Sequence, residues 1–204
     1  MIVKEKTGPQ VPPGTHLAVC YRVVDLGTQP DTGFGSKEKL CIFFELPHER
    51  ITIKDAAGHD KEVPMGMSRF YSKTLGKRSN LRKDLEAWRG RAFTKEELDG
   101  FDLSAILGKA CQLQVADNGE GKSQIVAVVG VPKGTSVPPA SNPIMEYSIS
   151  EGKDSAKYKI LPEWVRTMCD ACIEWQPESE KTSTPMHDAP AGEPVADDSS
   201  EMPF

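Results

Sequence analysis

The order of strand-like and helix-like patterns constrains the fold of this chain more than any other feature of its sequence. Five stretches carry the β-branched and aromatic residues that are typical of strands: 15–26, 37–46, 67–74, 110–116 and 122–131. Between the third and the fourth of them, Leu81, Leu85 and Trp88 recur at the helical period after the capping residue Ser79. The sequence therefore predicts a mainly β protein with a helical insertion after its third strand.

Three strands, a helical insertion and two strands is the element order of an OB-fold, a five-stranded and partly open barrel. Two short helices are expected to complete the insertion, because Thr94 and Glu97 form a capping box and Asp102 can cap a further turn. We therefore predict a five-stranded OB-fold-like barrel with its helical insertion between strands 3 and 4, and a different small barrel is the alternative. The segment 51–63 fits either a short hairpin or a polar loop.

Composition divides the chain into three parts. Residues 1–14 are rich in proline and glycine, which predicts an extended N-terminal arm. The domain is expected to span residues 15–176, with a proline-rich loop at 132–156 and a C-terminal helix over residues 162–175. Residues 177–204 hold seven acids, one base and a single aromatic residue. Such a tail buries too little apolar surface to fold, so we expect a disordered acidic tail.

Charge is distributed unevenly along the chain. The net charge is −5, but the tail carries −6 and the remaining 176 residues carry +1. Within the domain, residues 66–92 hold eight bases and two acids, a local charge of +6. A cluster of cations on one surface is typical of nucleic-acid binding. The alternative is a solvated strand edge and helix face.

Aromatic residues interleaved with these bases favour a single-stranded ligand, because cations hold phosphates while aromatic rings stack on bases of any identity. In the third predicted strand, Arg69, Tyr71 and Lys73 share one face, and Phe70 lies on the other with its serine neighbours. We take the face with two cations as the binding face. Trp88 is expected in the core, because its spacing from the two helical leucines is that of a buried stripe.

Two phenylalanines outside the basic stretch are further stacking candidates. Phe34 lies in a glycine-rich loop, and Phe43 shares a predicted strand face with Lys39. Strand alternation requires that either Phe43 or its neighbour Phe44 faces the core. The candidate nucleic-acid-binding residues are Phe34, Lys39, Phe43, Arg69, Tyr71, Lys73, Lys77, Arg78 and Arg82.

The last eight residues of the chain combine acids with a terminal Pro-Phe. The sequence Asp197-Asp198-Ser199-Ser200-Glu201-Met202-Pro203-Phe204 resembles the C-terminal tip of bacterial single-stranded DNA-binding proteins. The resemblance implies that the tip docks on replication or repair proteins, with Phe204 as the anchor, Pro203 and Met202 beside it, and Asp197, Asp198 and Glu201 on nearby cations. Two serines interrupt the acidic run, which departs from the family pattern. The predicted barrel is more similar in architecture to the OB-fold variants of bacteriophages than to the tetrameric bacterial protein.

The sequence gives little support for catalysis, metal binding or a membrane location. The four histidines are scattered without ligand spacing, and no phosphate-binding glycine loop is present. Cys169 and Cys172 form a Cys-x-x-Cys, but no second pair lies at zinc-finger spacing, so half-buried reduced thiols are favoured over a metal or redox site. No apolar run reaches the ~20 residues of a membrane span. We expect a cytoplasmic protein, not an enzyme, without cofactor or metal.

Together these patterns predict sequence-independent binding and protection of single-stranded DNA in replication or recombination, with partner recruitment through the tip. The resemblance implies a bacteriophage-type protein. Two alternatives stay open: an OB-fold adaptor that binds only protein, and an RNA-binding protein, because stacking and phosphate contacts do not distinguish the sugars. Self-association into a homo-oligomer also stays open.

Overall fold

The computed structural model of the chain describes residues 9–30 and 35–177. Its framework is one open sheet of six strands: β1 (Gly14–Gln29), β2 (Lys37–Lys54), β3 (Asp60–Ser72), β4 (Ala110–Asp117), β5 (Ser123–Val129) and β6 (Met145–Ser148). The predicted mainly β architecture is confirmed. Five strands follow the order β3-β2-β1-β4-β5 with antiparallel neighbours, and β6 pairs in parallel with β1.

Two features of the sheet differ from the predicted five-stranded barrel. The sixth strand lies inside the segment 132–156 that was expected to be a loop. The sheet also stays open, because β3 and β5 are its two edges and pair through no ladder within the described part of the chain. The edges are bridged by a side chain instead: the Arg69 guanidinium on β3 donates to the Ile125 carbonyl on β5 at 2.9 Å.

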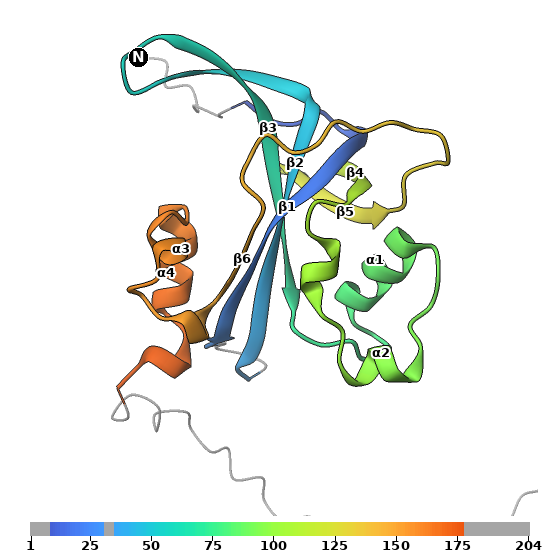
Figure 1. Cartoon of the computed structure of the whole chain (residues 1–204), viewed down its shortest axis with the longest axis vertical. Coiled ribbons are helices and arrows are strands. Elements are labelled where there is room, and N and C mark those ends of the chain that lie inside the picture. The colour runs from blue at the N-terminus through green and yellow to red at the C-terminus, as the bar shows by residue number, and fades with distance from the viewer. Residues whose placement is uncertain (1–8, 31–34, 178–204) are drawn as a thin grey trace, which may run out of the picture.

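The segment 51–63 forms a hairpin, the first of its two predicted alternatives. The β2–β3 ladder shifts register between Leu46 and Arg50 and then continues to the pair Lys54–Asp60. Figure 1 shows this hairpin extending beyond the body of the sheet. Its side chains are largely exposed, and its far end is held by the ladder, by the ion pair of Lys54 with Asp60 and by hydrogen bonds to the Asp55 carboxylate.

The helical insertion covers one face of the sheet (Figure 1). It consists of α1 (Asn80–Arg89), α2 (Lys95–Asp99) and η1 (Leu103–Ile106), and each begins at its predicted capping residue. Leu85 and Trp88 of α1 pack with Phe44 of β2 in the core of this face. The Trp88 indole donates to the Ala110 carbonyl at 2.7 Å, which confirms the predicted core position of Trp88.

The other face of the sheet is covered by residues 145–176, which we call the C-terminal module (Figure 1). The module contains β6, η2 (Ile149–Glu151), α3 (Ala156–Lys159), α4 (Glu163–Asp170) and η3 (Ile173–Trp175). A single helix over residues 162–175 was predicted, but α4 ends before Ala171 and a 3-10 turn follows. Cys169 and Cys172 are free thiols and are fully buried in this second core, deeper than the half-buried positions expected.

The predicted N-terminal arm is attached to the domain over its described residues, 9–13. Val11 is buried in the first core. The Ser123 hydroxyl donates to the Val11 carbonyl at 2.5 Å, and the Ser123 amide donates to the side chain of Gln10 at 3.1 Å. These contacts tie the lead-in of β1 to the start of β5.

Candidate nucleic-acid interface

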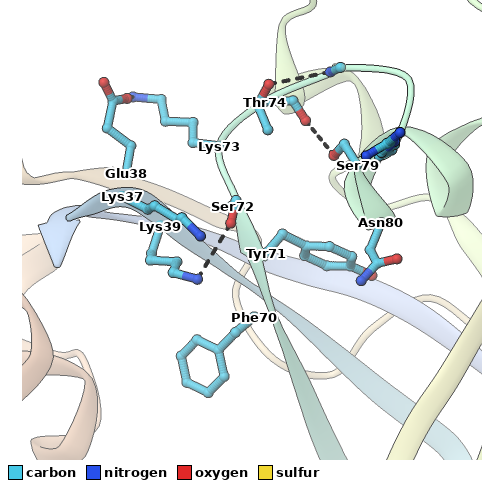
Figure 2. Close-up of a pocket in the computed structure, with 12 residues that line it drawn as sticks. Lys37, Glu38, Lys39, Phe70, Tyr71, Ser72, Lys73, Thr74, Ser79 and Asn80 are labelled. Atoms are coloured by element: carbon cyan, nitrogen blue, oxygen red, sulfur yellow. Dashed lines mark hydrogen bonds and ion pairs between the residues drawn. The ribbon is translucent and has the colours of Figure 1, made fainter. Parts of the chain in front are cut away.

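A basic hollow lies where the chain leaves the sheet for the helical insertion. It has a volume of about 700 Å³ and is formed by the start of β2, the end of β3 and the loop that leads to α1 (Figure 2). Four of its lining residues are basic and one, Glu38, is acidic. The basic ones are Lys37, Lys39, Lys73 and Arg78. The hollow therefore offers a positive surface to an anionic ligand.

The loop that carries Lys77 and Arg78 is fixed by its own hydrogen bonds. The Ser79 hydroxyl donates to the Thr74 carbonyl at 2.5 Å, and the Ser79 amide donates to the Gly76 carbonyl at 2.9 Å. The same Ser79 hydroxyl caps α1 by accepting from the backbone amide of Arg82. Lys77 and Arg78 are exposed, and neither is in an ion pair within the described part of the chain. A ligand would find both cations unneutralised on an ordered loop.

Lys39 and Phe70 both line the hollow, and they lie together on the outer face of the sheet, which is the face that carries the C-terminal module (Figure 2). Their strands place them there, because Lys39 pairs with Ser72 and the next residue of β2 on the same face, Cys41, pairs with Phe70. The Lys39 ammonium donates to the Ser72 hydroxyl at 3.4 Å. The Phe70 side chain is 46% exposed. An exposed ring beside a lysine is the combination that stacking on a base next to a phosphate requires.

Arg69 and Tyr71 were predicted as binding residues, and the structure places both on the inner face. Tyr71 is only 4% exposed, and its hydroxyl donates to the Asp84 carboxylate of α1 at 2.8 Å. Burial, followed by the negative charge of Asp84, raises the pKa of Tyr71. Arg69 lies 3.4 Å from the same carboxylate. These two residues hold α1 against β3, and Tyr71 contributes to the wall of the hollow with its hydroxyl engaged by Asp84.

Two further predicted cations are largely neutralised by acids. The Lys73 ammonium lies 2.7 Å from Asp25 and 3.6 Å from Glu38, and the hydrogen bond to Asp25 raises the pKa of Lys73. Arg82 pairs with Glu86 one helical turn further on at 2.9 Å. Lys73 lines the basic hollow, and Arg82 lines a second hollow beside it, at the start of α1. The acidic partners of both side chains reduce the positive field that they contribute.

Phe43 was predicted to stack on a base, but it lies in the second core. It is 4% exposed, because the ring of Trp164 on α4 covers it with centroids 5.6 Å apart. Alternation places its neighbour Phe44 in the first core, so both rings are buried, on opposite faces of the sheet. The predicted fold did not include a C-terminal module over this face. Phe34 lies outside the described residues.

Trp164 continues the exposed aromatic surface from Phe70. The two rings are 5.9 Å apart and inclined at 74°, and Trp164 is 44% exposed. Trp164 belongs to the C-terminal helix that was predicted over residues 162–175. Helical spacing distinguishes the buried positions of this segment from Trp164. Val165, Cys169 and Cys172 recur at i, i+4 and i+7 and are buried, whereas Trp164 lies one residue before this series.

The described residues contain no group of three or more His, Cys, Asp or Glu side chains that could hold a metal ion. No helix among them is long and apolar enough to cross a membrane. The six residues of the predicted docking tip lie outside the described part of the chain: Asp197, Asp198, Glu201, Met202, Pro203 and Phe204.

Comparisons of the chain with protein-family models, with curated proteins and with solved structures find no match.

Proposed function

We propose that this protein binds single-stranded DNA without sequence preference, through the basic hollow and the outer face of β2 and β3. The observation that carries the proposal is the position of Phe70, an exposed ring on the same face as Lys39 and at the margin of a hollow with four basic residues. Lysine and arginine side chains neutralise phosphates, and an exposed ring stacks on any base. A double helix conceals its base faces, so a stacking surface favours a single strand.

The arrangement of strands supports the proposal. β1 lies between β2 and β4, the edges β3 and β5 face each other across the Arg69 bridge, and α1 follows β3 in sequence. We propose that this is an OB-type barrel left open between β3 and β5, with β6 as an addition. OB-folds bind oligonucleotides on the face of strands 2 and 3, which is where the hollow lies.

The acidic tip adds a second proposed activity, recruitment of replication or repair proteins. The proposal depends on the resemblance of residues 197–204 to the bacterial tip and on their charge. It is separable from DNA binding, because the hollow is formed by residues 37–80.

Fluorescence anisotropy with a labelled oligo(dT) of about 30 nucleotides tests DNA binding, since OB-fold sites span roughly 4–16 nucleotides. We expect binding at low salt that weakens linearly on a logarithmic salt scale. Lys39→Gln and Arg78→Gln should each weaken binding and reduce the salt slope by about 0.7, the single-strand value for one lost phosphate contact. Lys133→Gln is the matched control, because Lys133 is exposed and lines neither hollow.

Absence of binding at low salt would overturn the proposal and favour the adaptor alternative. If Lys133→Gln weakens binding as much as Lys39→Gln and Arg78→Gln do, the DNA binds outside the hollow. Competition with an RNA oligomer of the same sequence shows which nucleic acid the site prefers.

A further inference from the structure

We propose that Trp164 of α4 is a base-stacking residue, so that the C-terminal module supplies part of the binding surface as well as covering the sheet. This inference depends on the proposed binding of single-stranded DNA. It extends the site from β2 and β3 to a helix more than 80 residues later in the chain.

Trp164 is exposed, yet its ring is held in place. Phe43 lies beneath it at 5.6 Å between centroids, and Phe70 lies beside it at 5.9 Å. A ring fixed on two sides loses little rotamer freedom when a base stacks on it. Nearly half of its surface stays open to solvent, and this surface is continuous with that of Phe70.

The Trp164 ring covers Phe43, but it is not the main attachment of α4 to the sheet. The helix is attached to the sheet by Val165 and Cys169, both fully buried, and Trp164 lies beside that stripe. Large exposed aromatic rings in contact with each other are a mark of binding surfaces. The basic hollow on the other side of Phe70 identifies the occupant as an anionic ligand with aromatic groups, which a single nucleic-acid strand is.

The angle between the two rings indicates how they share the ligand. Phe70 and Trp164 are inclined at 74°, so both rings cannot lie parallel to one base. We infer that they contact two bases of the strand, Phe70 the one nearer the hollow and Trp164 the one beyond it. Removal of both rings should then weaken binding more than removal of either.

Tryptophan fluorescence tests this directly, because stacking of a base on an indole quenches its emission. In the full chain, saturating oligo(dT) should quench the emission of the native protein and of Trp175→Phe. It should leave the emission of Trp164→Phe almost unchanged. Trp175 is the matched control, since it packs on Tyr158 and Lys153 within the module and away from Phe70.

Affinity gives the second readout. By anisotropy, Trp164→Ala should weaken binding by about 5- to 150-fold, the range for loss of one stacked base. Trp164→Phe keeps an aromatic ring and should bind within about a few-fold of the native protein.

If the native protein binds oligo(dT) while Trp164→Phe shows native quenching and Trp164→Ala shows native affinity, the inference is wrong and the proposed function stands. If the native protein does not bind oligo(dT) at low salt, both fail. Should Trp164→Ala not fold, the quenching of Trp164→Phe still decides the question.

Discussion

At the scale of single residues, neighbouring positions of β3 have opposite roles. Phe70 faces outward at the margin of the hollow, and Tyr71 faces inward with its hydroxyl on Asp84. Strand alternation alone separates them. One ring is therefore proposed to act on the ligand, and the other stabilises the contact between β3 and α1.

Separate substitutions of Tyr71 and Phe70 should distinguish an effect on stability from an effect on DNA binding. Tyr71→Phe removes a hydrogen bond to a buried carboxylate, so we expect a loss of about 1.5–3 kcal/mol in the free energy of unfolding and unchanged DNA affinity. Phe70→Ala removes a half-exposed ring and its contact with Trp164, so it should reduce the free energy of unfolding by only about 0.5–1.5 kcal/mol but weaken DNA binding by about 1–3 kcal/mol. Urea unfolding and anisotropy measure the two effects. If Tyr71→Phe is folded under the assay conditions and still binds DNA more weakly, the inner face of β3 contacts DNA.

The sequence predicted which residues of β3 share a face, but it did not predict which of the two faces packs on α1. Alternation placed Arg69 with Tyr71 and set Phe70 apart from them, as observed. The choice of binding face followed the cations, but Arg69 and Tyr71 of that face are engaged by Asp84. Asp84 lies on α1, and only the packing of that helix on β3 shows that Arg69 and Tyr71 have a buried partner.

At the scale of elements, the segment between β5 and β6 is held by one buried carboxylate. Glu45 of β2 is fully buried and accepts from the Ser141 amide at 2.7 Å, the Asn142 amide at 2.8 Å and the Asn142 side chain at 2.6 Å. Burial raises the pKa of Glu45, but the hydrogen bonds from Ser141 and Asn142 outweigh it, and the net pKa lies below 4.5. The contact places the segment so that β6 can pair with β1.

This contact predicts a pH dependence. Because the pKa of Glu45 is lower in the folded state than in the unfolded chain, its contribution is present above pH 4.5 and is lost as the pH falls through the folded value. Glu45→Gln should reduce the free energy of unfolding by about 2 kcal/mol at neutral pH. The difference from the native protein should shrink as the pH falls to about 3.

Urea unfolding of both proteins across this range measures the difference, with Glu146→Gln as the control because Glu146 is exposed on β6. A difference that stays constant with pH would show that the carboxylate makes no ionised contact.

Element boundaries were predictable where the chain carries its own local signals. Ser79, Thr94 and Asp102 each cap the element predicted for them. β6 was missed because it is four residues long and lies in a proline-rich segment, where only its pairing with β1 makes it a strand. The break at Ala171 was missed because the apolar spacing continues across it to Cys172.

At the scale of the whole molecule, the sheet separates two cores, and the end of β1 attaches the C-terminal module to it. The Glu174 carboxylate of the module accepts from the Thr28 amide at 2.9 Å and from the Thr28 hydroxyl at 2.6 Å. The Gln29 side chain donates to the Met168 carbonyl at 3.0 Å. The sequence predicted one barrel core and a trailing helix. The second core was missed although the strand residues that face it are as apolar as those facing the first, a pattern that is typical of strands buried on both faces.

Gly27 makes this attachment testable. Its backbone is left-handed, with φ of 68°, and a Cβ atom there would lie 2.5 Å from the Ile149 Cδ1 atom and 3.0 Å from the Cys172 Cβ atom. Gly27→Ala should therefore reduce the free energy of unfolding by about 1 kcal/mol for the backbone and a further 1–3 kcal/mol for the forced repacking. Gly90→Ala is the matched control, since Gly90 has the same φ with nothing near the added atom.

The same pair of variants links the module to binding. If Trp164 stacks on a base, displacement of the module by Gly27→Ala moves that ring from its place beside Phe70. DNA affinity should then fall in Gly27→Ala and stay native in Gly90→Ala, as measured by anisotropy where both are folded. Equal affinity in the two variants, with a stability difference confirmed by urea unfolding, would mean that the module supports the sheet without shaping the ligand surface. A selective loss in Gly27→Ala would show that contacts at the end of β1 determine where the aromatic surface lies.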